Sequence, residues 1–198
     1  MKKIILTGGP CAGKSTVIEF VEEAFGKRVV IVPEAATVLL SGGFPVPGRD
    51  IEWSLEWQYH FQKTIVTLQR ALEVTHQQIA QASGAKTLIC DRGLLDGVAY
   101  TPGGVTEFCQ LYEVDRQLAE DEYALVIHLE SLAVNKPELY GKSGNKNRFE
   151  NSKEARELDQ KTKDAWCCHK NQIVLSGRKE LSEIKTEVIN LITREIQP

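Results

Sequence analysis

The residues most able to do chemistry form one glycine-rich segment near the start of the chain, Gly8-Gly9-Pro10-Cys11-Ala12-Gly13-Lys14-Ser15. Two glycines separated by four residues and followed by Lys-Ser have the spacing of a P-loop. The glycines let the backbone wrap around an anion with successive N–H groups pointing inward. Lys14 is placed to reach the β- and γ-phosphates of a nucleoside triphosphate, and the Ser15 hydroxyl to ligate Mg²⁺.

The residues on either side support this interpretation. An apolar run at 3–6 predicts a strand, and the pattern at 13–24 predicts a helix whose positive end faces the same phosphates. A glycine turn with an incidental Lys-Ser is the alternative, but it would not require a strand before it and a helix after it. We therefore expect the chain to bind a nucleoside triphosphate. The expected binding residues are Gly8, Gly9, Pro10, Cys11, Ala12, Gly13, Lys14, Ser15 and Thr16.

Two carboxylates follow continuously apolar segments. Glu34 comes after the predicted strand 28–32, and Asp91 comes after the predicted strand 87–90. Ligands of open α/β sheets bind beyond the carboxyl ends of the strands, so both are expected near the P-loop. Asp91 fits the role of a Mg²⁺ ligand, with an N-cap or turn residue as the alternative. Glu34 fits the base that orients an acceptor hydroxyl; a water-mediated Mg²⁺ contact and a solvated turn residue are the alternatives.

Three arginines are candidates for acting on the reacting groups. Arg92 could clamp a phosphate or orient an acceptor, and Arg148 and Arg156 could neutralise the transferring phosphoryl group. Arg92 follows Asp91, although a surface ion pair with Asp96 would also explain it. Arg148 and Arg156 flank the start of a helix predicted over 152–169, where they suit a lid that closes over the nucleotide. The alternative for Arg148 and Arg156 is a solvated basic face whose charge is balanced by nearby glutamates.

The apolar periodicity predicts an α/β fold in a single domain covering 1–198. Short, fully apolar strands alternating with helices are typical of a doubly wound parallel sheet. Asp50 is expected to cap the long helix, Ser152 to cap the lid-side helix, 100–106 to form a surface loop, and 130–151 to be irregular. The predicted strands are 3–6, 28–32, 87–90, 123–129 and 172–175, and the predicted helices are 13–24, 35–40, 51–81, 105–120, 152–169 and 181–196.

Three further groups each allow a structural and a functional interpretation. Trp53, Trp57 and Phe61 recur at helical spacing, which is typical of core but leaves an acceptor pocket open. His128, within a predicted strand, is expected to be buried and hydrogen-bonded rather than catalytic. The segment 167–169, Cys-Cys-His, invites a zinc interpretation, but adjacent cysteines without a second spaced pair lack the usual ligand spacing.

The composition of the 198 residues is typical of a soluble globular protein, with 42% hydrophobic and 26% charged residues. The formal net charge of −3 provides no field that would attract nucleic acid or an acidic membrane, and no apolar run approaches a membrane span. The chain starts on a strand and P-loop rather than a signal peptide. Five cysteines, one of them inside the P-loop, favour free thiols in a reducing cytoplasm.

With these residues in view, the chain resembles the small-molecule and nucleoside kinase branch of P-loop proteins. More narrowly, it is similar to small AAA-type ATP-binding proteins related to ribosylnicotinamide kinase domains. The matching segments are 8–15, 32–36 and 91–100, with Arg148, Glu154-Ala155, Ala165-Trp166, His169, Asn171 and Ile173. The resemblance implies a three-layer α/β/α fold, a parallel sheet of order 2-3-1-4-5, a helical lid at about 130–165 and adenine contacts near Ser176-Gly177.

By the same resemblance, Glu34 would be the base, and the Asp91-Arg92 pair would serve the metal and the acceptor hydroxyl. Deoxynucleoside kinases usually carry glutamate at the position of Asp91, so the division of roles between Asp91 and Glu34 stays open. The leading hypothesis is that the protein transfers the γ-phosphate of ATP, with Mg²⁺, to a small hydroxyl-bearing and nucleoside-like acceptor. An ATPase, or a nucleotide-dependent switch read by a partner protein, is the alternative. The guanine-specific Asn/Thr-Lys-x-Asp pattern is absent from the sequence, which favours ATP. A pocket beside Glu34, lined by residues such as Phe44, Arg49, Trp53 and Trp57, would favour the kinase over the switch.

Overall fold

A computed structural model describes residues 1–140 and 151–196 and contains a five-stranded sheet. Each neighbouring pair of strands is parallel, and the order is β2-β3-β1-β4-β5, which confirms the predicted fold. The register pairs Ile4 of the central strand with Ile89 on one side and with Leu125 on the other. The strands are β1 (Lys2–Gly8), β2 (Val29–Val32), β3 (Thr87–Asp91), β4 (Leu125–Leu129) and β5 (Gln172–Leu175).

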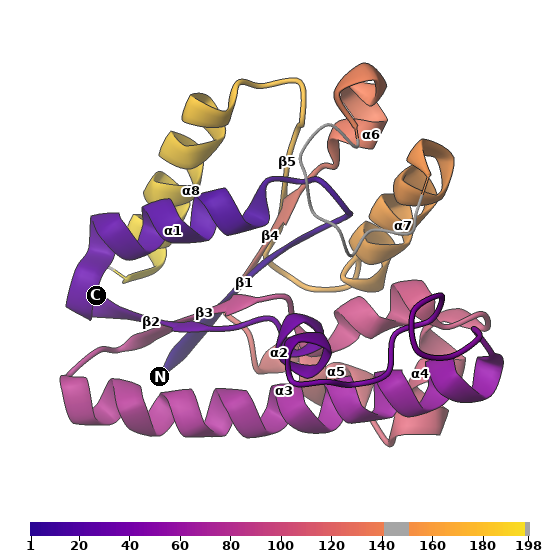
Figure 1. The fold of residues 1–198 in the computed structure, drawn as a ribbon. Helices are drawn as coiled ribbons and strands as arrows, with labels where there is room; N and C mark the ends of the chain where they lie inside the picture. Colours follow the sequence, from indigo (N-terminus) through magenta and orange to yellow (C-terminus); the bar gives the residue numbers. More distant parts are fainter. Residues whose placement is uncertain (141–150, 197–198) are drawn as a thin grey trace.

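The sheet separates two hydrophobic cores, so the molecule has three layers (Figure 1). Successive strand side chains point to opposite faces. In β1, Ile4 and Leu6 enter one core while Ile5 enters the other. Helices α1 (Lys14–Phe25) and α8 (Leu181–Ile196) cover the first face through side chains such as Val17 and Val188. Strands that are buried on both faces need a continuously apolar sequence, and this feature predicted the parallel sheet.

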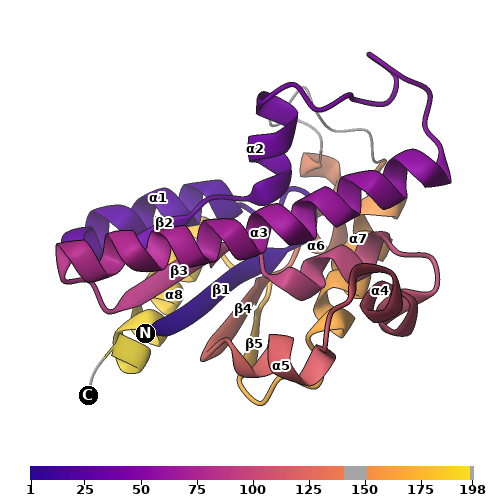
Figure 2. The ribbon, with the colours of Figure 1, turned by 90° about the horizontal axis from the view of Figure 1, so that it is seen from below.

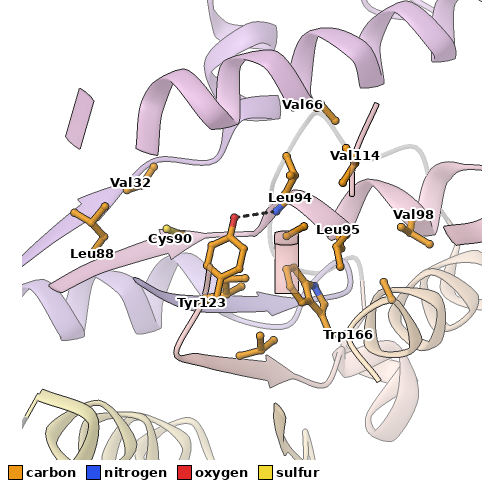
Figure 3. Close-up of a cluster of buried hydrophobic side chains, with 14 of the residues drawn as sticks. Val32, Val66, Leu88, Cys90, Leu94, Leu95, Val98, Val114, Tyr123 and Trp166 are labelled. Atoms are coloured by element: carbon orange, nitrogen blue, oxygen red, sulfur yellow. Dashed lines mark hydrogen bonds between the residues drawn. The ribbon is translucent and has the colours of Figure 1, made fainter. Parts of the chain in front are cut away.

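The second face is covered by the long helix α3 (Leu55–Ser83), which lies across the strands in Figure 2. The 3₁₀ segment η2 (Leu94–Tyr100) and α4 (Gly104–Tyr112) add Leu95 and Phe108 to this core. Figure 3 shows Trp166 among these side chains, with the Tyr123 hydroxyl bonded to the Leu94 amide at 3.4 Å. Within the described ranges, no helix is both long and apolar enough to cross a membrane.

Shorter elements connect the layers. A 3₁₀ turn η1 (Gly26–Arg28) precedes β2, so the strand begins one residue later than predicted. Helix α2 (Ala35–Ser41) follows β2, and α5 (Arg116–Asp121) precedes β4. After β4, α6 (Leu132–Asn135) and the 3₁₀ turn η3 (Pro137–Leu139) replace part of the segment predicted to be irregular.

The predicted cap of the long helix was wrong. Asp50 accepts a hydrogen bond from the Val46 amide at 2.9 Å and pairs with Arg49, which closes a loop instead of a helix. Ser54 has an extended backbone, with φ −145° and ψ 159°, and its hydroxyl oxygen accepts a hydrogen bond from the Trp57 amide. Ser54 is therefore the N-cap of α3, and the residues before it are left free to line a cavity.

The helix predicted over 105–120 is two helices. Glu113 has φ 52° and ends α4, and the Asp115 side chain accepts from the Leu118 amide to start α5. The expected surface loop at 100–106 is largely helical as well, because η2 extends to Tyr100 and α4 begins at Gly104. The apolar periodicity spans this break because both helices bury residues in the same core.

The charged helix after β4 is α7 (Ser152–Ala165), four residues shorter than predicted. Its cap is Asn151 rather than Ser152, and Glu154 completes a capping box by accepting from the Asn151 amide. Trp166 leaves the helix, and Cys167 and Cys168 form a turn. Thus the two cysteines are outside regular helix, contrary to the sequence pattern.

Candidate functional site

The P-loop connects β1 to α1 in the predicted manner. Gly13 is the N-cap of α1 and has φ 79°, a left-handed conformation that strains residues with a Cβ. Ser15 and Thr16 are exposed in the first turn. The Lys14 ammonium donates to the Gly8 carbonyl at 3.3 Å and thus folds back over the loop. In a P-loop, backbone N–H groups, the N-terminus of the following helix and the lysine ammonium together bind phosphate.

A second part of the chain braces this loop. The Asp159 carboxylate of α7 accepts from the Gly9 amide at 2.9 Å and from the Ser131 amide at 3.0 Å. The Ser131 hydroxyl donates to the Pro10 carbonyl. A Cβ on Gly9 would lie 2.7 Å from Asp159, so only glycine permits this approach. The side chain of His128 is fully buried, as expected, and its Nε2 lies 3.3 Å from the same carboxylate oxygen. The expected hydrogen bonding was wrong, because neither ring nitrogen has a hydrogen-bond partner among the described residues.

We expect Asp159→Ala to lower the free energy of unfolding by about 2–4 kcal/mol, because it leaves two buried amides without their acceptor. Urea denaturation measures the loss. Burial opposes ionisation of Asp159, but the nearby His128 ring and the hydrogen bonds from the Gly9 and Ser131 amides lower its pKa. The contribution is therefore fully present above the carboxyl's unfolded pKa and is lost as the pH falls through the lower folded pKa.

Glu157→Ala is the matched control, since this residue lies on the same helix with a side chain 59% exposed. Its effect is expected to stay within about 0.5 kcal/mol. Equal destabilisation by the two variants at pH 7, or an Asp159→Ala effect that does not diminish in acid, would contradict the assignment.

At the carboxyl ends of β2 and β3, Glu34 and Arg92 form an ion pair, and Asp91 lies beside them at the end of β3. Glu34 precedes α2, and its other carboxylate oxygen accepts from the Thr37 hydroxyl at 2.5 Å. The two carboxylates and the arginine were predicted separately, from two strand ends, and the sheet brings them together. Lys14 belongs to the same group, because the charges of Glu34 and Asp91 both act on it.

Arg92 is held in an unusual conformation. Its φ is 70°, in the left-handed region, and its amide donates to the Leu6 carbonyl at 3.1 Å. The guanidinium also contacts Asp96 at 3.2 Å, so the anticipated Arg92–Asp96 pair exists, but the side chains are only 16% and 5% exposed. It is therefore not a surface ion pair. Backbone conformations of this kind cost energy and cluster at functional sites.

Asp96 links this arginine to the rest of the fold. One of its oxygens accepts from the Thr7 hydroxyl of β1 at 2.5 Å, and the other accepts from the Trp166 indole at 2.7 Å. Both donors are fully buried. A network of buried bonds therefore runs from the end of α7, through Asp96 and Arg92, to Glu34.

The charges in the site determine which groups are ionised. Burial opposes ionisation of Glu34, but the positive charges of Arg92 and Lys14 outweigh it and lower the pKa of Glu34 to about 2. Burial, helped by the charge of Arg92, lowers the pKa of Lys14. Glu34 is consequently a carboxylate at neutral pH, the form that accepts a hydrogen bond from a hydroxyl.

Asp91 is the exception in this cluster. One of its carboxylate oxygens is buried without a hydrogen-bond partner among the described residues. Burial, to which the charge of Glu34 adds, raises the pKa of Asp91 to about 6 against the attraction of Lys14. A bare carboxylate oxygen, on a side chain close enough to the P-loop for the charge of Lys14 to act on it, fits an oxygen-binding dication such as Mg²⁺. Mg²⁺ typically takes one or two protein ligands together with phosphates. No group of three His, Cys, Asp or Glu side chains in the described ranges is arranged to hold a metal by itself.

We expect Asp91→Asn to stabilise the protein at pH 7, in the presence of a chelator and without nucleotide, by on the order of 2 kcal/mol. The reason is that the amide has the shape of the carboxylate but carries no charge to desolvate. Thermal unfolding measures the gain. Asp121→Asn, at an exposed position at the end of α5, is the control and is expected to show no gain. A less stable Asp91→Asn protein would show that the carboxylate has a structural partner.

A cavity of about 720 Å³ opens beside Glu34 and Arg92. It lies between α2, the loop at 46–48, the start of α3 and η2, and its volume is in the range of small-molecule sites. Trp53 and Trp57 line it as predicted, but Phe44 and Arg49 do not. Phe44 instead packs against Trp57 and Phe61, with ring centroids 6.3 and 5.2 Å apart, and Arg49 pairs with Asp50.

The aromatic residues at the start of α3 and just before it therefore divide between the two predicted roles, core packing and lining of an acceptor pocket. Phe61 is buried, and it stacks on Trp57 with ring centroids 4.8 Å apart. Trp53 is 60% exposed, so a core role for it was wrong. Gln62, one residue further, lines the cavity and is 3% exposed, and its carbonyl oxygen has no hydrogen-bond partner among the described residues. An apolar wall with a few fixed polar groups is typical of ligand sites.

The remaining predicted residues are more distant or undescribed. Arg148 lies outside the described residues, and Arg156 is exposed on α7, one turn before Asp159. Gly177 is buried in the loop after β5, where its amide donates to Glu130 at 3.2 Å. His169 does not resemble a zinc ligand, because one ring nitrogen contacts the Tyr123 carbonyl at 2.9 Å and the other accepts from the Asn171 amide.

Sequence reasoning assigned no roles to Asp159, Trp166 and Gln62, and it considered Asp96 only as a surface partner of Arg92. A signal for two of them exists along α7 and the residue that follows it, where four buried residues recur at helical spacing: Ala155, Asp159, Thr162 and Trp166. A carboxylate in an otherwise buried stripe must have a partner. The partners lie 150 and 70 residues away along the chain, so the sequence alone does not identify them.

Comparisons with known proteins agree with this architecture. A structure of deoxyadenosine kinase from M. mycoides with bound dATP superposes with a TM-score of 0.64 at 15% sequence identity, covering 98% of this chain and 100% of that one. No curated protein matches the sequence. The family model described as an AAA domain matches residues 3–183, which include the P-loop and the strand ends described above. The chain belongs to the AAA-domain family of P-loop proteins.

Proposed function

We propose that this protein transfers the γ-phosphoryl group of ATP to the hydroxyl of a small acceptor bound in the cavity beside Glu34. The observation that carries the proposal is the cavity itself, about 720 Å³ and lined by both Glu34 and Arg92. An ATPase needs room only for water, and a nucleotide switch needs no acceptor cavity. The whole chain then acts as a single kinase-like domain, with a lid at about 130–165.

In this reaction the P-loop amides and Lys14 hold the triphosphate, while Ser15 and Asp91 are the protein ligands of the nucleotide's Mg²⁺. The ion, when bound, neutralises phosphate charge. One oxygen of Asp91 has no partner among the residues that the structure describes, whereas each oxygen of Glu34 already accepts one hydrogen bond, which supports assigning the metal to Asp91 rather than to Glu34. Ser176-Gly177 remains the proposed adenine contact.

Glu34 acts on the acceptor. The transition state of phosphoryl transfer is loose, so the nucleophile needs orientation more than early deprotonation. A carboxylate with a pKa of about 2 is a weak base but a permanent hydrogen-bond acceptor, which suits that task. Arg92, held between Glu34 and Asp96, contributes positive charge at the same place. Arg148 and Arg156 are proposed to approach the transferring group from the lid.

A nucleoside-like acceptor fits the lining of the cavity. Trp53 and Trp57 offer aromatic faces to a planar ring. Gln62 carries an acceptor and a donor on one amide, the pair that reads the polar edge of a heterocycle, and its carbonyl oxygen lacks a partner. The polar end of such an acceptor would lie toward Glu34.

The proposal is tested by ³¹P NMR of the purified protein with Mg-ATP, with and without a pool of nucleosides and small hydroxylated metabolites. A new phosphoester resonance that depends on the pool and is absent for Lys14→Ala is the expected result. Free phosphate formed equally in both samples would overturn the kinase in favour of an ATPase. ATP binding without turnover in either sample would favour the switch, or an acceptor missing from the pool.

A further inference from the structure

The turn that follows α7 carries two neighbouring thiols on the surface. Cys167 and Cys168 are both exposed and reduced, and their sulfur atoms are 3.8 Å apart. The other cysteines differ: Cys11 and Cys90 are buried, and Cys109 is half-buried on α4. The segment therefore brings two accessible nucleophiles within reach of each other, and neither of them lines the cavity beside Glu34.

The surroundings distinguish the two sulfur atoms. The Arg116 guanidinium donates to the Cys167 sulfur at 3.9 Å and is itself fixed by Glu120 at 2.9 Å. The thiolate is the reactive form of cysteine, and the Arg116 guanidinium lies within hydrogen-bond distance of the Cys167 sulfur. The hydrogen bond with Cys167 raises the pKa of Cys168. A small cavity of about 90 Å³ adjoins Cys168.

We propose that Cys167 and Cys168 form a thiol–disulfide exchange site whose co-reactant is a low-molecular-weight disulfide. The Cys167 thiolate attacks one sulfur of that disulfide and expels a thiolate, which leaves a mixed disulfide. Cys168 then loses its proton and attacks the Cys167 sulfur, which forms the vicinal bond and expels the second thiolate. The protein loses two electrons and two protons, and the co-reactant gains both as two thiols.

The product would be a labile bond. Neighbouring Cα atoms are about 3.8 Å apart across a trans peptide, below the usual range for disulfides. Strained and exposed disulfides are readily reduced and serve regulation rather than structure. The exchange is therefore reversible under modest changes in thiol concentration.

The position of this turn couples it to the proposed catalytic cluster. The amide of His169 donates to the Trp166 carbonyl at 2.9 Å, so one hydrogen bond spans the two cysteines. The residues on both sides are buried and anchored: the Trp166 indole donates to Asp96, and the His169 ring contacts the Tyr123 carbonyl. Figure 3 shows Trp166 inside the core.

A disulfide between Cys167 and Cys168 closes a ring through the peptide that joins them, so the conformation of that peptide must change. Because the neighbours on both sides are anchored, Trp166 or His169 must move to accommodate this change. Because Asp96 also holds Arg92, displacement of the Trp166 indole loosens the Arg92–Glu34 pair. The consequence for turnover rests on the proposed kinase reaction, but the thiol chemistry and the movement of the indole do not.

The test equilibrates the full-length protein in glutathione disulfide–glutathione buffers and records intact mass, disulfide peptide maps and the ¹H–¹⁵N indole resonance of Trp166, assigned with Trp166→Phe. We expect oxidation to remove two hydrogens, to join Cys167 to Cys168 and to shift that resonance, all reversed by excess thiol. Cys168→Ser should instead retain one glutathione on Cys167. Cys109→Ser is the control and should oxidise like the wild type.

Stable glutathione addition to the wild type without the intramolecular bond, or a bond involving another cysteine, would overturn the exchange site. An unmoved Trp166 resonance in the oxidised protein would overturn the coupling. If the kinase reaction is established, oxidation should also lower turnover about tenfold without weakening ATP binding, and the Cys167→Ser/Cys168→Ser protein should be insensitive. If oxidation forms the Cys167–Cys168 bond and shifts the Trp166 resonance, but the reduced protein has no kinase activity, only the proposed phosphoryl transfer is refuted.

Discussion

Glu34→Gln is expected to lower turnover about 10²- to 10⁴-fold while ATP affinity changes little. Glutamine keeps the size of the side chain, but it no longer presents a carboxylate to the acceptor hydroxyl. In the wild type the charges of Arg92 and Lys14 keep this group ionised. ATP titration followed by steady-state kinetics with the acceptor separates binding from turnover.

Thr37→Val is the matched control, because it removes only the 2.5 Å bond from Thr37 to Glu34 and keeps both the carboxylate and its Arg92 partner. Its turnover is expected to fall by less than about tenfold. A Glu34→Gln protein that loses ATP affinity and turnover to the same extent would assign Glu34 to the metal site. Similar turnover in the wild type and in Glu34→Gln would show that Glu34 has only a structural role at the start of α2.

The sheet was predictable from sequence because its strands are apolar enough to require burial between two layers. Each is a short apolar run, and β1, β3 and β4 bury nearly every side chain between two helical layers. The P-loop was predictable for a similar reason, since glycine spacing and a following Lys-Ser leave little freedom. Glu34 and Asp91 then followed from a simple rule about strand ends.

What the sequence could not provide were contacts between distant segments. Asp50 and Ser54 are both acceptable caps by residue type, and tertiary structure chose the second by using Asp50 to close a loop. The ends of α4 and α7 were missed because apolar periodicity continues through residues that remain buried after the helix has stopped. Trp166 is the clearest case: it is fully buried but belongs to no helix.

The same distinction applies to the site. Residue type and local position were enough to propose which groups contact phosphate and hydroxyl. The residues that hold those groups come from η2 and α7, and their roles depend on a fold that must already exist. Buried polar residues with a partner far along the chain are common wherever a site needs rigid support.

Lys14→Ala is expected to weaken ATP binding about 100-fold or more, because hydrogen bonds to charged phosphates are each worth about 1.5–3 kcal/mol and one ammonium group serves two phosphates. Isothermal titration with ATP, ADP and AMP measures the effect. Since Lys14 is placed at the β- and γ-phosphates, the loss should be large for ATP and ADP and nearly absent for AMP.

The comparison among nucleotides separates the role of Lys14 in binding from its role in the fold. Lys14 also acts on Glu34 and Asp91, so its removal leaves Arg92, within the described part of the chain, as the remaining cation that acts on both carboxylates. A collapse of the site would weaken all three nucleotides alike, whereas a lost phosphate contact affects only ATP and ADP. Lys27→Ala, at an exposed position after α1, controls for the loss of one positive charge. Unchanged ATP affinity in Lys14→Ala would remove the P-loop as the nucleotide site and with it the proposed reaction.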